Sequence, residues 1–163
     1  MSKYLTFDER LEIQKGLKYQ MSFGEIAKSI GKDRTTVAKE IKRYSYEQKT
    51  GYSGYPYNAC KHRKTCDRKN VCPLGCTKTS KYKCSICQLC NDVCDDFEEE
   101  VCSARFKPPY VCNGCEQYGK CTLKKLIYDA EDAHRLCQSR LSEGRTGIMC
   151  NEFDLARINA LIT

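Results

Sequence analysis

Cysteine density is the feature that most constrains how this chain can fold. Twelve of its 14 cysteines lie between residues 60 and 121, and few apolar side chains separate them. So small an apolar set cannot bury enough surface to offset the entropy lost on ordering the chain, and such a segment needs covalent or metal cross-links. The cysteines available to form them are Cys60, Cys66, Cys72, Cys76, Cys84, Cys87, Cys90, Cys94, Cys102, Cys112, Cys115 and Cys121.

The first thirty residues indicate the redox compartment. They carry charged side chains throughout and contain no apolar run as long as that of a signal peptide, and no later stretch approaches the length of a membrane span. We therefore expect a cytoplasmic protein without membrane contact. Because thiols stay reduced there, cysteine pairs at Cys-x-x-Cys spacing favour metal ligands over disulfides.

Zinc is the metal that this spacing favours. A closed structural zinc site takes four tetrahedral ligands, so twelve cysteines predict about three zinc ions. Our preferred grouping for one ion is the contiguous set Cys102, Cys112, Cys115 and Cys121. The other eight would form two further sites whose pairing the sequence leaves open, and His62 is a candidate to replace one of the eight.

An iron–sulfur centre is the alternative that the spacing raises. Residues 84–94 follow the pattern Cys-x2-Cys-x2-Cys-x3-Cys of half a bacterial ferredoxin motif. That motif continues with proline, whereas Asp95 follows Cys94 here, and residues 112–121 supply no second matching run. The pattern favours zinc, with an iron–sulfur redox or sensor protein as the rival hypothesis.

Charge is unevenly distributed along the chain, whose net charge is +7. Residues 51–90 hold eight Lys/Arg against one Asp/Glu, and residues 91–101 hold six acidic residues and no basic one. A basic first half suggests a polyanionic partner. The acidic run would match a phosphate backbone poorly, so we expect the cysteine-rich segment to be structural and its acidic run to form a solvated surface.

The N-terminal residues predict three short helices. Residues 6–9 and 22–25 each have the form of a capping box, which opens a helix. We expect a first helix over about residues 7–19, a second that ends at Gly31 and a third capped by Asp33. Three helices whose last two are joined by a tight, glycine-containing turn are the helix-turn-helix arrangement, in which the final helix enters the major groove of DNA.

The third predicted helix keeps Val37 and Ile41 on one face for the core and leaves hydrophilic residues on the other. Arg, Lys and Thr side chains are suited to contact base edges and phosphates, which makes double-stranded DNA the expected partner. The residues assigned to base edges are Arg34, Thr35, Thr36 and Lys39. The residues assigned to phosphates are Lys32, Lys42 and Arg43.

The predicted fold class is mainly α, with an irregular zinc-stapled segment between two helical parts. The parts are a helix-turn-helix domain at residues 1–44, a Tyr/Gly-rich linker at 45–59, the cysteine-rich zinc-binding segment at 60–121 and C-terminal helices at 122–163. In the last part, apolar residues from Leu123 to Leu141 recur at helical spacing and predict a helix of about twenty residues, and Asn151 caps a final helix.

Four stretches of the chain resemble the N-terminal part of transposases of the insertion-sequence-thirty family, in the cysteine-rich form found in low-GC Gram-positive bacteria. The similarity extends over nearly the whole chain, and its most specific part is the helix-turn-helix combined with the run Tyr-Val-Cys-Asn-Gly-Cys. The stretches are residues 5–10, residues 26–28 with 35–41, residues 109–115 and residues 125–130.

The resemblance implies binding to the terminal inverted repeats of an insertion sequence during transposition, a form of DNA recombination, at the nucleoid of a bacterial cell. In that family a separate RNase-H-like domain with an Asp-Asp-Glu triad cuts and joins the DNA. The chain stops at Thr163, before that domain. We therefore expect no enzymatic activity, and magnesium to matter only for the absent catalytic domain. A stand-alone helix-turn-helix transcriptional regulator stays open as an alternative, as does a homo-oligomer.

Overall fold

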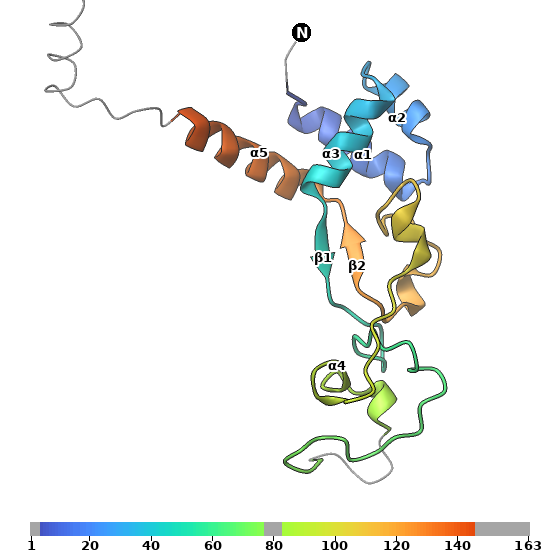
Figure 1. Ribbon diagram of the computed structural model, residues 1–163. Coiled ribbons are helices and arrows are strands. Elements are labelled where there is room, and N and C mark those ends of the chain that lie inside the picture. The colour runs from blue at the N-terminus through green and yellow to red at the C-terminus, as the bar shows by residue number, and fades with distance from the viewer. Residues whose placement is uncertain (1–3, 77–82, 146–163) are drawn as a thin grey trace, which may run out of the picture.

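The computed structural model describes residues 4–76 and 83–145 (Figure 1). Helices gather at one end, a two-stranded sheet leads away from them, and a lobe with little regular structure lies at the other end. The mainly helical fold class is confirmed. The elements are α1 (Phe7–Lys18), α2 (Phe23–Ser29), α3 (Arg34–Tyr44), β1 (Tyr46–Gln48), α4 (Cys90–Val93), β2 (Lys125–Ile127) and α5 (Ala130–Arg145), with short 3-10 helices at Cys84–Ile86, Ser103–Phe106 and Tyr118–Lys120.

The three N-terminal helices begin and end close to where the sequence predicts. Both capping boxes form, at residues 6–9 and 22–25, with side chain and backbone bonded reciprocally in each. The Asp33 carboxylate accepts the backbone N–H of Thr35 at 2.7 Å and caps α3. The final helix expected from Asn151 lies outside the described residues.

The turn between α2 and α3 is closed by Gly31, whose φ is +62°. The N–H of Lys32 donates to the carbonyl of Ala27 at 2.9 Å, and the N–H of Gly31 donates to the carbonyl of Lys28 at 3.3 Å. These are the two bonds of a Schellman motif, in which glycine takes the left-handed position without a side-chain clash. The turn therefore fixes where α3 starts and which of its faces is exposed.

Helix α5 packs into the same hydrophobic core as α1, α2 and α3, and we call these four helices the bundle. Ala133 and Cys137 of α5 belong to one buried cluster with residues of the three N-terminal helices. The Gln14 side chain on α1 accepts the backbone N–H of Ala130 at 2.6 Å and ties the start of α5 to α1. The described part of the C-terminal segment thus returns to the N-terminal domain.

A buried ion pair crosses the bundle core. Arg10 on α1 is 1% exposed, and its Nε donates to the carboxylate of Glu40 on α3 at 2.6 Å. Its Nη1 donates to the carbonyl of Leu5 at 2.7 Å and lies 3.2 Å from Nδ1 of His134 on α5. The Tyr128 hydroxyl reaches the Glu40 carboxylate at 3.4 Å, and burial, followed by that carboxylate, raises the pKa of Tyr128. The two buried charges neutralise each other, as a low-dielectric core requires.

The helix expected over residues 123–141 is wrong in its first part, because Lys125–Ile127 forms β2. This strand pairs antiparallel with β1, which lies in the segment predicted as a linker. The α5 helix starts at Ala130, where the Asp129 carboxylate accepts the N–H groups of the next turn. A short apolar run fits either a helix or a strand, and the partner strand that decides between them is distant in sequence.

The lobe at the far end is built around a small core. We define the cysteine lobe as residues 57–76 and 83–101. Its buried hydrophobic cluster consists of Tyr57 and Ala59 together with Leu123, and the other buried apolar side chains of the lobe are cysteines, namely Cys60, Cys84 and Cys90. Around this cluster the chain is mostly irregular, as the sequence predicts for the cysteine-rich segment. Among the described residues, no helix has both the length and the apolar character needed to cross a membrane.

Candidate nucleic-acid interface

Helix α3 presents a cationic face to solvent. The side chains of Arg34, Lys39, Lys42 and Arg43 are exposed. Within the described part of the chain, none of these four forms an ion pair with a carboxylate. The one acidic residue of α3, Glu40, is 9% exposed and turns inward to Arg10. The outer face of the helix therefore carries only positive charge, which suits it to approach a phosphate backbone.

The predicted contact residues of α3 fall on two flanks. One flank lines a groove that α3 forms with the start of α2, and the other lines a hollow toward Tyr4 and Tyr44. The groove flank is made of Arg34, Thr35 and Ala38. The other flank is made of Thr36, Lys39 and Arg43. The structure thus brings the four predicted base-edge residues onto one helix but separates Thr36, which is half-buried, from its neighbour Thr35.

Lys32, assigned to phosphate from the sequence, is engaged within the domain. Its Nζ lies 3.2 Å from the Glu9 carboxylate, and both side chains are 21% exposed. Burial acts to raise the pKa of Glu9 and is the largest single influence on it. Hydrogen bonds from Thr6 and Lys32 outweigh burial, so the pKa of Glu9 is lowered. Lys32 therefore ties the turn before α3 to α1, in addition to any contact with DNA.

The loop Pro108–Tyr110 closes the groove beside α3. This groove of about 690 Å³ lies between the start of α2, the first half of α3 and the loop. The Tyr110 ring centroid lies 4.2 Å from the Lys42 ammonium and 6.0 Å from the Phe23 ring centroid. The first distance is that of a cation–π contact, which holds Lys42 against the loop. Sequence reasoning missed Phe23, Ala38 and Tyr110, and its one signal for the loop was the resemblance around residues 109–115.

The turn at Cys112–Cys115, which we call the knuckle, docks on the end of α1. The Gln20 side-chain amide donates to the Gly114 carbonyl at 2.7 Å. A Cβ on Gly114 would lie 2.4 Å from the carbonyl oxygen of Leu17, and the φ of Gly114 is +73°. Both the close approach and the backbone conformation require glycine. The cysteine-rich segment is therefore held against the helix-turn-helix rather than tethered loosely behind it.

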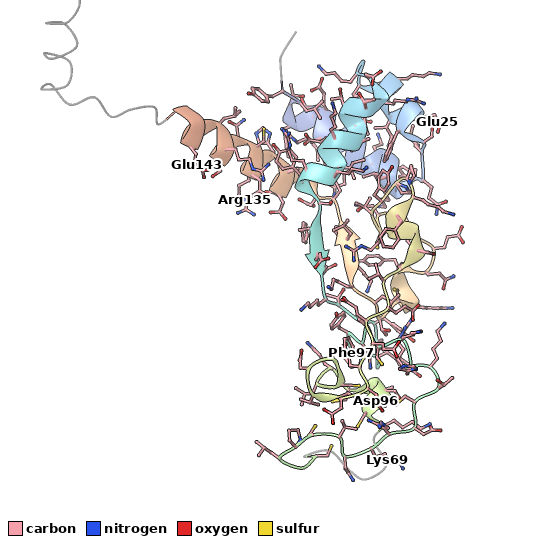
Figure 2. The ribbon with its side chains drawn as sticks, viewed as in Figure 1. Glu25, Lys69, Asp96, Phe97, Arg135 and Glu143 are labelled. Atoms are coloured by element: carbon pink, nitrogen blue, oxygen red, sulfur yellow. The ribbon has the colours of Figure 1, made fainter. Side chains whose placement is uncertain are left out.

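Charges in the cysteine lobe largely neutralise one another. The acidic run lies at the surface, as the sequence predicts, and several of its carboxylates pair with the basic residues of the lobe and of the chain after it. Figure 2 shows one of them, Asp96, in the lobe near α4. The pairs are Lys61–Glu98, Arg63–Glu100, Arg68–Asp96 and Lys124–Glu99. This pairing reduces the positive charge that the lobe offers to a polyanion, whereas the cations of α3 remain unpaired by carboxylates.

The thirteen cysteines of the described residues all carry free thiols, and Cys150 lies outside these residues. Within residues 4–76 and 83–145, no three or more His, Cys, Asp or Glu side chains are placed so that they could hold a metal ion as they stand. The prediction of about three zinc ions stays a prediction. His62, the candidate replacement ligand, has its Nε2 3.3 Å from the Glu98 carboxylate.

Comparison with known proteins identifies the N-terminal part of the chain. A family model described as a helix-turn-helix domain matches residues 2–44, the stretch that contains α1, α2 and α3. No curated protein and no solved structure matches the chain. Residues 2–44 are thus a helix-turn-helix domain, a DNA-binding fold whose last helix is the one that reads the groove.

Proposed function

We propose that the chain binds double-stranded DNA sequence-specifically, with α3 in the major groove. The observation that carries this proposal is the outer face of α3, where four cations are exposed and the only acid of the helix is turned into the core. An α-helix fits the major groove, and each base pair presents a distinct pattern of donors and acceptors there. Unpaired cations on such a helix supply affinity through phosphates and selectivity through base edges.

Position along α3 divides these two roles. Arg34 and Thr35 lie in the first turn of α3 and line the protein groove beside it. The first residues of a recognition helix are the ones that reach base edges in the DNA major groove. Lys39 and Thr36 occupy the other flank and complete the set that reads bases. Lys42, held over the Tyr110 ring, and Arg43 lie in the last turn and contact phosphates. Lys32 contributes a phosphate contact from the turn.

The DNA target in this proposal is the terminal inverted repeat of an insertion sequence, and the chain acts as the binding part of a transposase. The stretches that carry the family resemblance pack together around α3. Asn113 and the backbone of Tyr128 exchange hydrogen bonds at 2.7 and 2.9 Å, and the Tyr128 hydroxyl reaches Glu40 on α3. Stretches far apart in sequence, all of which take part in the family resemblance, thus contact one another beside α3. A transcriptional regulator that uses the same helix is the second candidate, supported by the same face of α3.

Zinc is the proposed cofactor, with about three ions that staple the cysteine-rich segment. The support is chemical: the described cysteines carry free thiols, and the lobe has very little apolar core. In this role zinc is structural. DNA cutting is not part of the proposed function. Phosphodiester cleavage by this class of enzyme needs carboxylates that hold two divalent ions.

A binding assay with the terminal repeat DNA tests the proposal. Purified full chain is titrated against a duplex of the repeat and against a shuffled duplex of equal composition, at several salt concentrations. We expect preference for the repeat. We also expect Lys39→Ala to reduce that preference by roughly 1–3 kcal/mol if Lys39 reads a base. The matched control is Lys15→Ala, an exposed lysine on α1 that pairs with Glu12.

The same mixtures are incubated with magnesium or manganese to test for cutting. We expect a shifted duplex and no nicked or joined product. Equal affinity for the repeat and the shuffled duplex would contradict the transposase proposal, and products above background would contradict the non-catalytic role. Preference for a promoter sequence over the repeat would favour the regulator.

A further inference from the structure

We propose that the eight cysteines between residues 60 and 94 form two nested zinc sites, an outer one and an inner one. This inference rests on the zinc proposed above and adds the pairing that the sequence leaves open. The outer site consists of Cys60, Cys66, Cys90 and Cys94. The inner site consists of Cys72, Cys76, Cys84 and Cys87.

The inner site is outlined by a small cavity of about 10 Å³. That space is close to one water-sized sphere, so it suits a single ion rather than an organic ligand. Thiols and apolar side chains alone surround it, the environment in which a soft metal site replaces a hydrophobic core. The lining residues are Val71, Cys72, Cys76, Cys84, Cys87, Cys90 and Val93.

Tight turns aim both members of each inner pair at this cavity. Gly75, with φ +84°, donates its N–H to the carbonyl of Cys72 at 3.0 Å and folds Cys76 back toward it. The N–H of Cys87 donates to the carbonyl of Cys84 at 2.9 Å across a 3-10 turn. Each pair therefore acts as a two-thiol clip, and the two clips face each other.

The outer site lies in an adjoining cavity that Cys60, Cys66, Cys90 and Cys94 line together. The backbone N–H of Ala59 donates to the Asn91 side chain at 2.8 Å. This bond joins the residue before Cys60 to the residue after Cys90, and so holds the two halves of the outer site together. The Arg68 guanidinium approaches the sulfur of Cys94 at 3.9 Å. Four thiolates around Zn²⁺ leave a net charge of −2, and a guanidinium beside them offsets part of it.

Cys90 lines both cavities, and the number of ligands assigns it to the outer one. The inner cavity already holds four other cysteines, whereas the outer cavity holds three besides Cys90. A closed structural zinc site takes four ligands, so Cys90 completes the outer set.

The third set is the one that remains. Cys102, Cys112, Cys115 and Cys121 line neither of these two cavities. They are also the four cysteines that sequence order alone groups around one ion. The twelve cysteines therefore divide into three groups of four.

Nesting follows from the path of the chain. The chain around residues 83–84 lies beside residues 67–68, which follow Cys66. The N–H of Cys84 donates to the carbonyl of Arg68 at 2.9 Å, and Lys83 pairs with Asp67. A chain that doubles back brings its innermost pairs together first and its outermost pairs together last. The ferredoxin-like run at residues 84–94 is consequently divided between two sites, which leaves no single iron–sulfur centre on it.

The sulfur atoms share these cavities without converging on one point. Closing a site therefore requires the cysteine side chains to move, for which rotation between staggered rotamers is available. Metal binding also removes the thiol protons, so both sites should lose zinc as the pH falls.

Stepwise zinc removal from the full-length wild-type chain tests the pairing. The chain is loaded with zinc, a chelator is added in increments, newly free thiols are alkylated, and mass spectrometry reports the modified fraction of each cysteine. We expect reactivity to rise together within each group of four, with Cys66 and Cys90 in one group and Cys76 and Cys84 in another. Co-release of Cys60, Cys66, Cys72 and Cys76 would overturn nesting in favour of sequential sites.

Single substitutions give the second readout. Cys66→Ala should lower bound zinc from about three ions to about two and expose Cys60, Cys90 and Cys94 to alkylation, whereas Cys76→Ala should expose Cys72, Cys84 and Cys87. If a variant loses all its zinc, the wild-type release pattern still decides the pairing. A wild-type chain that takes up no zinc would overturn the inference together with the proposed cofactor. Binding to the repeat duplex tests the DNA proposal independently of zinc uptake.

Discussion

The main hydrophobic cluster of the described residues contains twelve buried side chains, nine of them on the four helices of the bundle, whereas the cluster at the cysteine lobe contains three, one of which is Leu123 from outside the lobe. The polar groups of the bundle are also arranged differently, since one ion pair is buried between its helices and the exposed cations of α3 have no carboxylate partner among the described residues. In the lobe, opposite charges pair with each other at the surface. Packing therefore stabilises one region and leaves a charged face available for a ligand. The other region lacks the apolar surface to do the same and needs cross-links.

The chain that follows the cysteine lobe docks on the bundle and forms the joint between the two regions. The knuckle at Cys112–Cys115 contacts the end of α1 through Gly114, and β2 leads from the knuckle region into α5 of the bundle. Cross-links in the cysteine-rich segment are thus positioned to hold the Pro108–Tyr110 loop beside α3. Each region can be perturbed by itself, and the responses should differ.

Zinc removal should produce the largest difference between the two regions. Structural zinc contributes roughly 10–16 kcal/mol in zinc-finger peptides, more than the small lobe core can replace. We expect a chelator to abolish hydrogen-exchange protection across residues 60–121 and to leave α1, α2 and α3 protected. Chelator already saturated with zinc is the control. Loss of protection in α1 to α3 at the same chelator concentration would show that the bundle has no stability of its own.

Breaking the buried ion pair should destabilise the bundle and leave the cysteine lobe unchanged. Glu40→Gln leaves the Arg10 guanidinium buried without its counter-charge, and we expect roughly 3–5 kcal/mol less stability toward urea, followed by helical circular dichroism. The matched control is Glu12→Gln on the exposed side of α1. Protection of the lobe cysteines from alkylation in the zinc-loaded chain should be unchanged. A loss no larger than that of the control would mean that the pair does not stabilise the bundle.

Helix ends in the N-terminal domain were predictable because their signals are local. Capping boxes, the Asp33 cap and Gly31 each act within a few residues, and the sequence places them correctly. The strand at Lys125–Ile127 was not predictable in this way, since its partner β1 lies far away in sequence. Packing of α5 into the bundle was missed for the same reason.

The candidate site shows the same division. Exposure of Arg34, Lys39, Lys42 and Arg43 follows from helical spacing around Val37 and Ile41. The engagement of Lys32 with Glu9 and of Lys42 with Tyr110 depends on tertiary contacts that spacing does not encode. Cysteine spacing likewise gives the number of possible sites, whereas the pairing depends on how the chain doubles back.

Substitution at the joint should have the smallest effect of the three. Gly114→Ala places a methyl group against the carbonyl of Leu17 and forces a left-handed alanine, which costs about 1–2 kcal/mol for the backbone conformation alone. We expect lower stability and a shifted nuclear magnetic resonance signal for the Gln20 side-chain amide, with all twelve thiols still protected in the zinc-loaded chain. Gly119→Ala is the matched control, because a Cβ there meets nothing within 4 Å. An unshifted Gln20 signal would contradict docking of the knuckle on α1.

Selection of bound sequences from a random pool of duplex DNA tests the central claim, that α3 reads base sequence. Full-length wild-type chain, the Arg34→Ala variant and the Arg135→Ala variant are each put through the same rounds of binding at fixed salt. Arg135 is an exposed arginine on α5, where it pairs with Asp132 of the same helix (Figure 2). We expect the wild type and Arg135→Ala to enrich one common motif and Arg34→Ala to relax it at a defined position. Recovery of no motif by the wild type, or of an identical motif by Arg34→Ala, would contradict base reading by this face of α3.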